Sequence, residues 1–105
     1  MSRRIEVTEA ARQDLLAIHR YLAAEAGYDT ADAFVARLAE RGAGLADFPD
    51  RGAPADLPLD GVRVRSVLVA PYRLFYEIAE DVVTIFAVLH TRRDLAALLE
   101  ERGRR

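Results

Sequence analysis

The first half of the chain carries apolar residues at helical spacing. The stripe consists of Ala11, Leu15, Ile18 and Leu22. Its members follow one another at intervals of four, three and four residues, which places them on one face of an α-helix. Thr8 is suited to cap the start of this helix, and Gly27 is suited to end it. We therefore predict an amphipathic helix between these two residues.

A second helical stripe follows after a short gap. It consists of Phe34, Leu38 and Leu45. Asp29 or Thr30 is suited to cap this helix, and the few residues between the two helices predict an antiparallel helical hairpin. Gly42 and Gly44 each lower helix stability by about 1 kcal/mol relative to alanine. They indicate either a close approach to the first helix or a frayed helix end.

The second half of the chain has the patterns of β-strands. The stretch 48–61 holds three of the four prolines and predicts a loop. After it, Val62–Ala70 and Tyr72–Ala79 alternate apolar and polar residues, as half-buried strands do. Val82–Leu89 is apolar on both faces, which is typical of a central strand covered on both sides. Glu80 and Asp81 predict a tight turn between the last two strands.

Two shorter segments complete the pattern. Ile5–Val7 can form a brief strand before the first helix, and Asp94 can cap a final helix that carries Leu95, Leu98 and Leu99. The predicted order of elements is β-α-α-β-β-β-α. We predict a single domain over residues 1–105, of the α+β class, in which the helical hairpin packs on an antiparallel sheet.

The composition excludes several classes of protein. The chain has 105 residues, 51% of them hydrophobic, no cysteine and a net charge of −2. Disulfides, thiolate nucleophiles and cysteine-built zinc sites are therefore excluded. The charge argues against a general nucleic-acid binder or sequence-specific DNA binding by the chain alone. No apolar run is long enough for a membrane span or a secretory signal, so we expect a cytoplasmic protein.

Residues for self-contained catalysis are scarce. The only histidines, His19 and His90, are far apart and lack the spacing of a zinc site. Ser66 lies within a predicted strand and Ser2 near the terminus, so neither has the surroundings of a nucleophilic serine. We expect no metal, no cofactor and no catalytic triad.

Arginines gather on and beside the predicted sheet. Residues 61–76 contain three arginines and no acid, and all fifteen basic residues of the chain are arginine. The group comprises Arg63, Arg65, Arg73, Arg92 and Arg93, with His90 between them. It is either a solvated face whose side chains cover apolar surface, or a set of unpaired charges for an anionic partner. That partner would be an RNA backbone or an acidic helix of another protein. His90 would be a hydrogen-bonded strand end, a partner contact or a proton donor.

Two sets of motifs stand out along the whole chain. The first is A-x-x-DL-x-x-I-x-x-Y over residues 11–21, followed by FP-x-x-G over 48–52. The second is YRLFYEI over 72–78, followed by VTIFAVLHTRRDL over 83–95. In their order and spacing these motifs resemble the ParE branch of the ParE/RelE toxin superfamily, and the likeness covers residues 3–100.

This resemblance implies a RelE/ParE-like fold and the toxin of a type II toxin–antitoxin system. Such a toxin is paired with a cognate antitoxin, ParD-like in this branch, which wraps it with an extended or helical C-terminal segment. RelE-like members cleave mRNA on the ribosome with basic side chains of the sheet and a late tyrosine or histidine. ParE-like members block DNA gyrase.

The resemblance also assigns individual residues. Arg73 matches the strand arginine of the RNA-cleaving members, Arg92 matches the arginine after the last strand, and His90 matches the ParE histidine. Their lysines and late tyrosine have no counterpart, because the chain has no lysine and residues 95–99 read LAALL. A ribonuclease would need His90 to move the 2′-OH proton and the two arginines to stabilise the phosphorane.

We therefore expect a non-catalytic toxin that inhibits gyrase by protein binding. A ribosome-dependent ribonuclease and a non-toxic remnant that serves only as a binding module are the alternatives.

The antitoxin is expected at one of two kinds of surface. An acidic segment would meet the predicted arginine face, whose members are Arg63, Arg65, Arg73, His90, Arg92 and Arg93. An apolar segment would occupy grooves beside Leu15, Ile18 or Leu38. Charge reversal at Arg65 or Arg73 would weaken only the first kind of complex.

Overall fold

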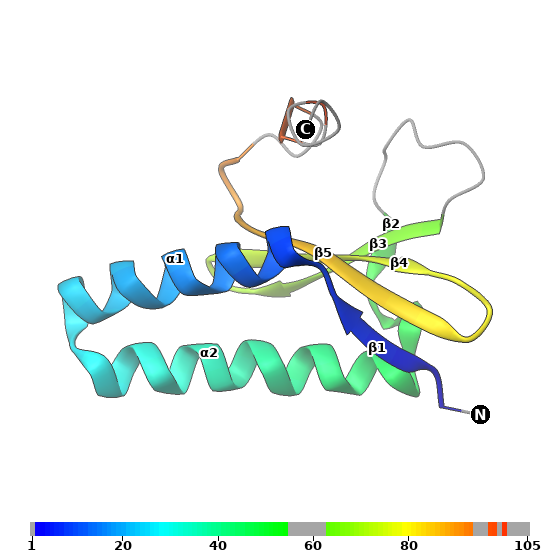
Figure 1. The fold of residues 1–105 in the computed structure, drawn as a ribbon, viewed down its shortest axis with the longest axis horizontal. Coiled ribbons are helices and arrows are strands. Elements are labelled where there is room, and N and C mark those ends of the chain that lie inside the picture. Colours follow the sequence, from blue (N-terminus) through cyan, green and yellow to red (C-terminus); the bar gives the residue numbers. More distant parts are fainter. Residues whose placement is uncertain (1, 55–62, 94–96, 99, 101–105) are drawn as a thin grey trace.

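The protein is described by a computed structural model over residues 2–54, 63–93, 97, 98 and 100. Two long helices, α1 (Glu9–Ala26) and α2 (Tyr28–Ala43), run side by side and extend beyond the sheet (Figure 1). The strands are β1 (Arg4–Val7), β2 (Ala53–Pro54), β3 (Arg63–Val69), β4 (Tyr72–Ile78) and β5 (Val82–His90). Two short 3₁₀ helices, η1 (Gly44–Ala46) and η2 (Pro49–Arg51), lead from α2 to β2.

The predicted α+β class and order of elements are confirmed as far as β5. Each of the three strands predicted in the second half agrees with β3, β4 or β5 to within one residue at either end. The predicted turn is also confirmed, since the Ala79 N–H donates to the Val82 carbonyl. Of the predicted final helix, Ala97, Leu98 and Glu100 are helical, whereas Asp94, Leu95 and Leu99 lie outside the described residues.

The sheet is mixed, whereas a wholly antiparallel sheet was predicted. Its strand order is β1-β5-β4-β3-β2, and β1 runs parallel to β5 while the other pairs are antiparallel. The reason is the helical hairpin between β1 and the rest of the sheet, because only a tight hairpin forces antiparallel neighbours. The predicted loop contains β2, whose Pro54 is compatible with an edge strand because it has no N–H to donate.

The helix ends show two correct predictions and one wrong prediction. The Thr8 hydroxyl accepts the Ala11 N–H at 3.1 Å, so the predicted cap of α1 is confirmed. Gly27 ends α1 with φ of 94°, in the left-handed region that favours glycine. It is also the first residue before α2, which starts at Tyr28 without a side-chain cap. Asp29 and Thr30 therefore lie inside α2, because the single glycine reverses the chain earlier than predicted.

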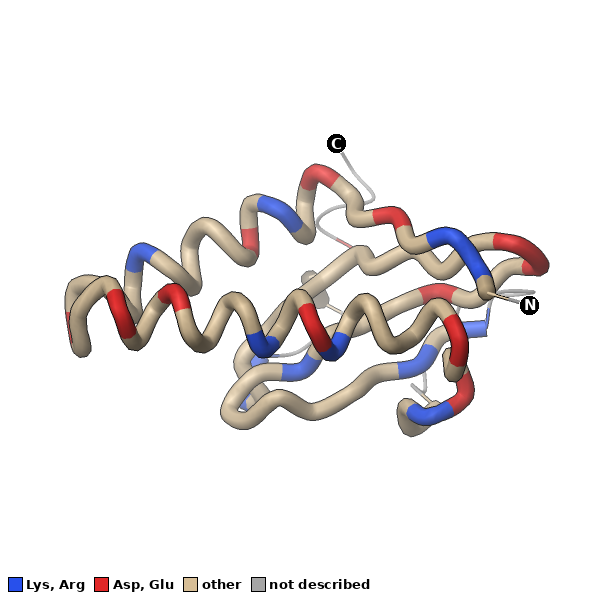
Figure 2. Tube along the Cα trace, turned by 90° about the horizontal axis from the view of Figure 1, so that it is seen from below, with Lys and Arg blue, Asp and Glu red and all other residues tan. Residues whose placement is uncertain are grey.

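The core lies between the helices and one face of the sheet. Ala11 and Ile18 of α1 and Phe34 and Leu38 of α2 are buried there against β3, β4 and β5. A Cβ on Gly42 would lie 3.0 Å from Ile85 Cδ1, so this glycine permits close approach of α2 to the sheet. The predicted alternatives were a close approach to the first helix or a frayed helix end. Charged residues are spread along both helices (Figure 2).

Candidate functional site

The predicted arginine face is divided between the two sides of the sheet. Arg65 is paired with Tyr76, which points toward the helices into the core, and Arg63 lies two residues earlier on the same side. Arg73 is paired with Leu68 on one side and Leu89 on the other. Because successive strand side chains alternate, Arg73 points to the sheet face opposite α1 and α2. The predicted residues therefore do not form one surface.

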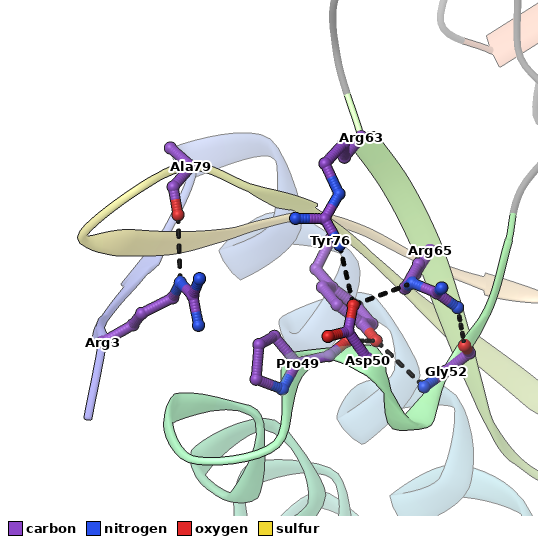
Figure 3. Close-up of polar contacts among 8 residues, drawn as sticks. All are labelled: Arg3, Pro49, Asp50, Gly52, Arg63, Arg65, Tyr76 and Ala79. Carbon is purple, nitrogen blue, oxygen red and sulfur yellow. Dashed lines mark hydrogen bonds and ion pairs between the residues drawn. The ribbon is translucent and has the colours of Figure 1, made fainter. Parts of the chain in front are cut away.

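Arg63 and Arg65 share a carboxylate (Figure 3). Asp50 Oδ1 lies 2.8 Å from Arg63 Nη2 and 3.5 Å from Arg65 Nε. Arg65 Nη1 also donates to the Gly52 carbonyl. One of the two interpretations of the arginine group was a set of unpaired charges, because no acid is near these residues in sequence. For Arg63 and Arg65 that interpretation was wrong, because η2 brings in Asp50 from 13 residues before Arg63.

The Tyr76 side chain holds the turn at residues 49–52 through hydrogen bonds to its backbone. Its hydroxyl donates to the Pro49 carbonyl and accepts the Gly52 N–H at 3.1 Å, and the side chain is fully buried. Burial raises the pKa of the Tyr76 phenol, so the group stays protonated and able to donate. A Cβ on Gly52 would collide with the Tyr76 hydroxyl and would lie 2.6 Å from the Ser66 carbonyl oxygen. The FP-x-x-G motif and the second tyrosine of YRLFYEI are thus direct structural partners.

His90 ends β5 on the helix-facing side. It lies opposite Tyr72, with ring centroids 5.4 Å apart in an edge-on arrangement. Its Nδ1 accepts the backbone N–H of Arg92 at 3.2 Å, so the neutral ring carries its proton on Nε2. Arg92 and Arg93 are exposed beyond the strand end. The contacts of His90 match the prediction of a hydrogen-bonded strand end.

Arg73 has a separate environment. It is half-buried, and its Nη1 donates to the Ser66 hydroxyl at 3.2 Å. Arg73 is the cross-strand partner of Leu89, the residue before His90. The side chains of Arg73 and His90 consequently point to opposite faces of the sheet.

An apolar cavity of about 280 Å³ lies between β1, the two helices and the sheet. Of the three predicted groove residues, Leu15 and Leu38 line this cavity and Ile18 does not. Ile18 is a core residue with 6% exposure. Val35, Ala39 and Ala43 of α2 also line the cavity, and the last two are exposed.

A second groove was not predicted. It measures about 640 Å³ and lies between α2 and the free edge of β3; we call it the α2–β3 groove. Its charged lining comes from Arg37, Glu40 and Arg41 of α2 and from Arg51 of η2. The spacing of four residues between Arg37 and Arg41 indicates that they share a helix face. It does not show which strand of the sheet lies next to that face.

The described residues form neither a cluster of metal ligands nor a membrane-spanning helix. No three or more histidine, aspartate or glutamate side chains come together there as a possible metal site. Among the described helices none is long and apolar enough to cross a membrane.

The comparisons with known proteins identify the family. The model of the family described as "ParE toxin of type II toxin-antitoxin system, parDE" matches residues 5–95. The chain belongs to the ParE toxin family. This confirms the resemblance found in the sequence. No curated protein matches the chain.

Solved structures of toxin–antitoxin complexes have the same fold. The chromosomal ParDE system of P. aeruginosa matches with a TM-score of 0.70 and 20% identity, over 85% of this chain and 96% of that chain. The RelBE2 complex of Mycobacterium tuberculosis matches with a TM-score of 0.61 and 26% identity, over 86% of this chain and 99% of that chain. The archaeal RelE–RelB complex of Pyrococcus horikoshii OT3 matches with a TM-score of 0.63 and 14% identity, over 90% of this chain and 100% of that chain.

Proposed function

We propose that this ParE-family toxin acts by binding and inhibiting DNA gyrase and is neutralised by a ParD-like antitoxin. The observation that carries the proposal is the separation of Arg73 from His90, two of the residues that an RNA-cleaving site would need. Arg73 points to one face of the sheet, whereas His90 points to the other and is hydrogen-bonded to the backbone of Arg92.

The chemistry of RNA cleavage makes this separation significant. A general base must lie within hydrogen-bond distance of the 2′-OH while cations contact the same phosphate. His90 and Arg73 cannot meet that requirement across a sheet. The chain also has no lysine that could replace the arginine. A toxin without an assembled site has to act through its binding surfaces.

A ribosome-dependent ribonuclease is the second candidate. It is favoured by the 26% identity with the RelBE2 complex, which exceeds the 20% identity with the ParDE system. In that case the ribosome would have to supply the catalytic groups that the chain lacks.

Induction of the chain in cells without an antitoxin tests the proposal. We expect filamentation and a DNA-damage response while protein synthesis continues, and we expect the purified chain to inhibit supercoiling by gyrase. Prompt mRNA cleavage at ribosomal A sites would establish the second candidate. Normal growth at full expression would instead identify a non-toxic binding module.

The apolar cavity beside Leu15 and Leu38 offers a place for an apolar side chain of the antitoxin. Ala39 is exposed and lines it, so Ala39→Trp would fill the opening without removing a core residue. We expect this variant to weaken the antitoxin complex by about tenfold or more at an unchanged Tm. Full affinity would show that the antitoxin does not use the cavity.

A further inference from the structure

β5 contains a β-bulge near its middle. Tyr76 of β4 is paired with Ile85. Phe75, the residue before Tyr76, is paired with Ala87, so Phe86 is an extra residue in the register of β5 with β4. Bulges of this kind recur beside functional sites, where they redirect a side chain. The side chains that follow the bulge are therefore candidates for a function.

The bulge determines on which face of the sheet His90 lies. In the observed register His90 is opposite Tyr72 and points toward the helices. A regular strand continued from Ile85 would instead place Leu89 opposite Tyr72. His90 would then follow on the other face, where Arg73 lies. The extra residue thus takes His90 away from Arg73 and puts it beside Tyr72.

His90 joins a group of aromatic rings on the helix-facing side. The centroid of the Tyr72 ring lies 5.4 Å from that of His90 and 5.6 Å from that of Phe34. Phe34 is buried, so it supports Tyr72 from within the core. Burial and, next, the nearby phenol of Tyr21 raise the pKa of Tyr72, so its hydroxyl stays protonated and able to donate. We call Tyr21, Tyr72 and His90 the aromatic corner.

The aromatic corner is accessible and carries hydrogen-bond donors. Tyr21 is 59% exposed, and Tyr72 and His90 are half-buried. Because His90 Nδ1 accepts the Arg92 N–H, the neutral ring has its donor at Nε2. Arg92 and Arg93 are exposed and have no carboxylate partner among the residues that the structure describes. The corner and its edge therefore offer ring surface, N–H and O–H donors, and positive charge.

These properties fit an acidic protein surface. Tyrosine and arginine are enriched among the residues that dominate the energy of protein–protein binding. Rings already held by packing lose little further freedom when a partner binds. A nucleic acid fits less well, because bases stack on open ring faces, whereas the Tyr72 ring already packs with Phe34 and His90.

We propose that the toxin contacts its target protein through the aromatic corner, while Arg92 and Arg93 bind carboxylates of the target at its edge. The identification of that target as DNA gyrase rests on the proposed function. None of these five residues lines the α2–β3 groove or the apolar cavity, so the corner is a separate surface.

Substitutions in the aromatic corner test the proposal. Tyr21→Ala removes an exposed ring, and we expect the affinity of the purified chain for DNA gyrase to fall by about tenfold or more. Tyr28→Ala, at the 73% exposed tyrosine that begins α2, is the matched control and should bind like the wild type. His90→Leu should weaken binding to a similar degree. His90→Gln keeps an N–H donor near the position of Nε2 and should retain most of the affinity.

The charged edge is tested with the variant R92E/R93E. Both residues are exposed, so the variant should fold normally. We expect its affinity for gyrase to fall by about tenfold or more, and the loss should shrink as the salt concentration rises. R12E/R20E reverses two exposed arginines of α1 with the same change in net charge, and it should bind like the wild type.

A second readout separates this proposal from the proposed function. Growth arrest on induction without antitoxin requires the target surface, whatever the target is. If the wild-type chain arrests growth without binding gyrase, the proposed function fails, and loss of arrest in Tyr21→Ala and His90→Leu still supports the corner. If the wild-type chain binds gyrase and both variants bind it equally well, the corner fails and the proposed function stands.

Several other results would overturn the assignment. Full affinity of R92E/R93E would exclude the charged edge. Variants that bind gyrase normally but lose affinity for the antitoxin would make the corner an antitoxin surface. Loss of mRNA cleavage in these variants, in place of gyrase binding, would identify an RNA surface. A wild-type chain that neither arrests growth nor binds gyrase would have no target for the corner to contact.

Discussion

Two groups of arginines in this protein differ in what surrounds them. Arg63 and Arg65 lie on the sheet and share Asp50, which η2 brings to them. Arg37, Arg41 and Arg51 line the α2–β3 groove and have no carboxylate partner in the described part of the chain. The first group stabilises a turn, and the second leaves its charge available to a partner. Clustering of arginines in the sequence thus does not show which of them lack a carboxylate partner within the fold.

Gly52→Ala should have the largest effect on the turn that holds the first group. The added methyl group would collide with the Tyr76 hydroxyl and lie 2.6 Å from the Ser66 carbonyl oxygen. We expect the free energy of unfolding to fall by about 3 kcal/mol, the upper range for overpacking. Urea denaturation measures the change, and Gly44→Ala, where nothing lies within 4 Å, is the matched control. A loss as small as that of the control would mean that the turn is not closely packed.

Tyr76→Phe should have the next largest effect. It leaves the Pro49 carbonyl and the Gly52 N–H without their buried partner. We expect a loss of about 2 kcal/mol in the free energy of unfolding, because unsatisfied buried polar groups are costly. Tyr28→Phe, at a residue 73% exposed, should change stability little. Equal effects of the two substitutions would show that the Tyr76 hydroxyl does not hold the turn.

The same tyrosine predicts how stability depends on pH. Its pKa is raised from 10.0 mainly by burial, so above about pH 10 the folded state holds a proton that the unfolded state releases. Stability is therefore fully present below that pH and is lost as pH rises through the folded pKa. Tyr76→Phe should make the free energy of unfolding decline less steeply between neutral and strongly alkaline pH. An unchanged slope would assign the alkaline loss to other groups.

Asp50→Asn should have a smaller effect. Its carboxylate is exposed, and exposed ion pairs contribute about 0.2–1 kcal/mol each. We expect thermal unfolding to show a decrease in that range that shrinks at high salt. A loss as large as that of Tyr76→Phe would mean that the ion pairs, and not the tyrosine, hold the turn.

R37E/R41E should have the smallest effect on folding. Neither arginine has an internal carboxylate partner among the described residues, and surface substitutions of this kind change stability by about 0.5 kcal/mol or less. A clear loss in urea denaturation would show that the second group is structural as well.

The fold could be predicted further than the site. Helical spacing and strand alternation follow from local geometry, so α1, α2 and the last three strands were found from the sequence. The parallel pairing of β1 depends on the path of the chain through two helices, which no local pattern records. The ion pair of Asp50 with Arg65 could not be predicted from a local pattern either, because it depends on how η2 folds back onto the sheet. The opposite orientations of Arg73 and His90 follow from the register of β4 and β5.

The position of β1 has a consequence for synthesis of the toxin. β1 pairs with β5, and α1 is tied to the same strand because the Val88 N–H donates to Asp14 Oδ2 at 2.9 Å. β1 and α1 are synthesised first, but they can dock onto the sheet only after β5 has been synthesised. A nascent or prematurely terminated chain that lacks β5 cannot complete this fold. Only chains whose translation has passed His90 can therefore adopt the complete fold.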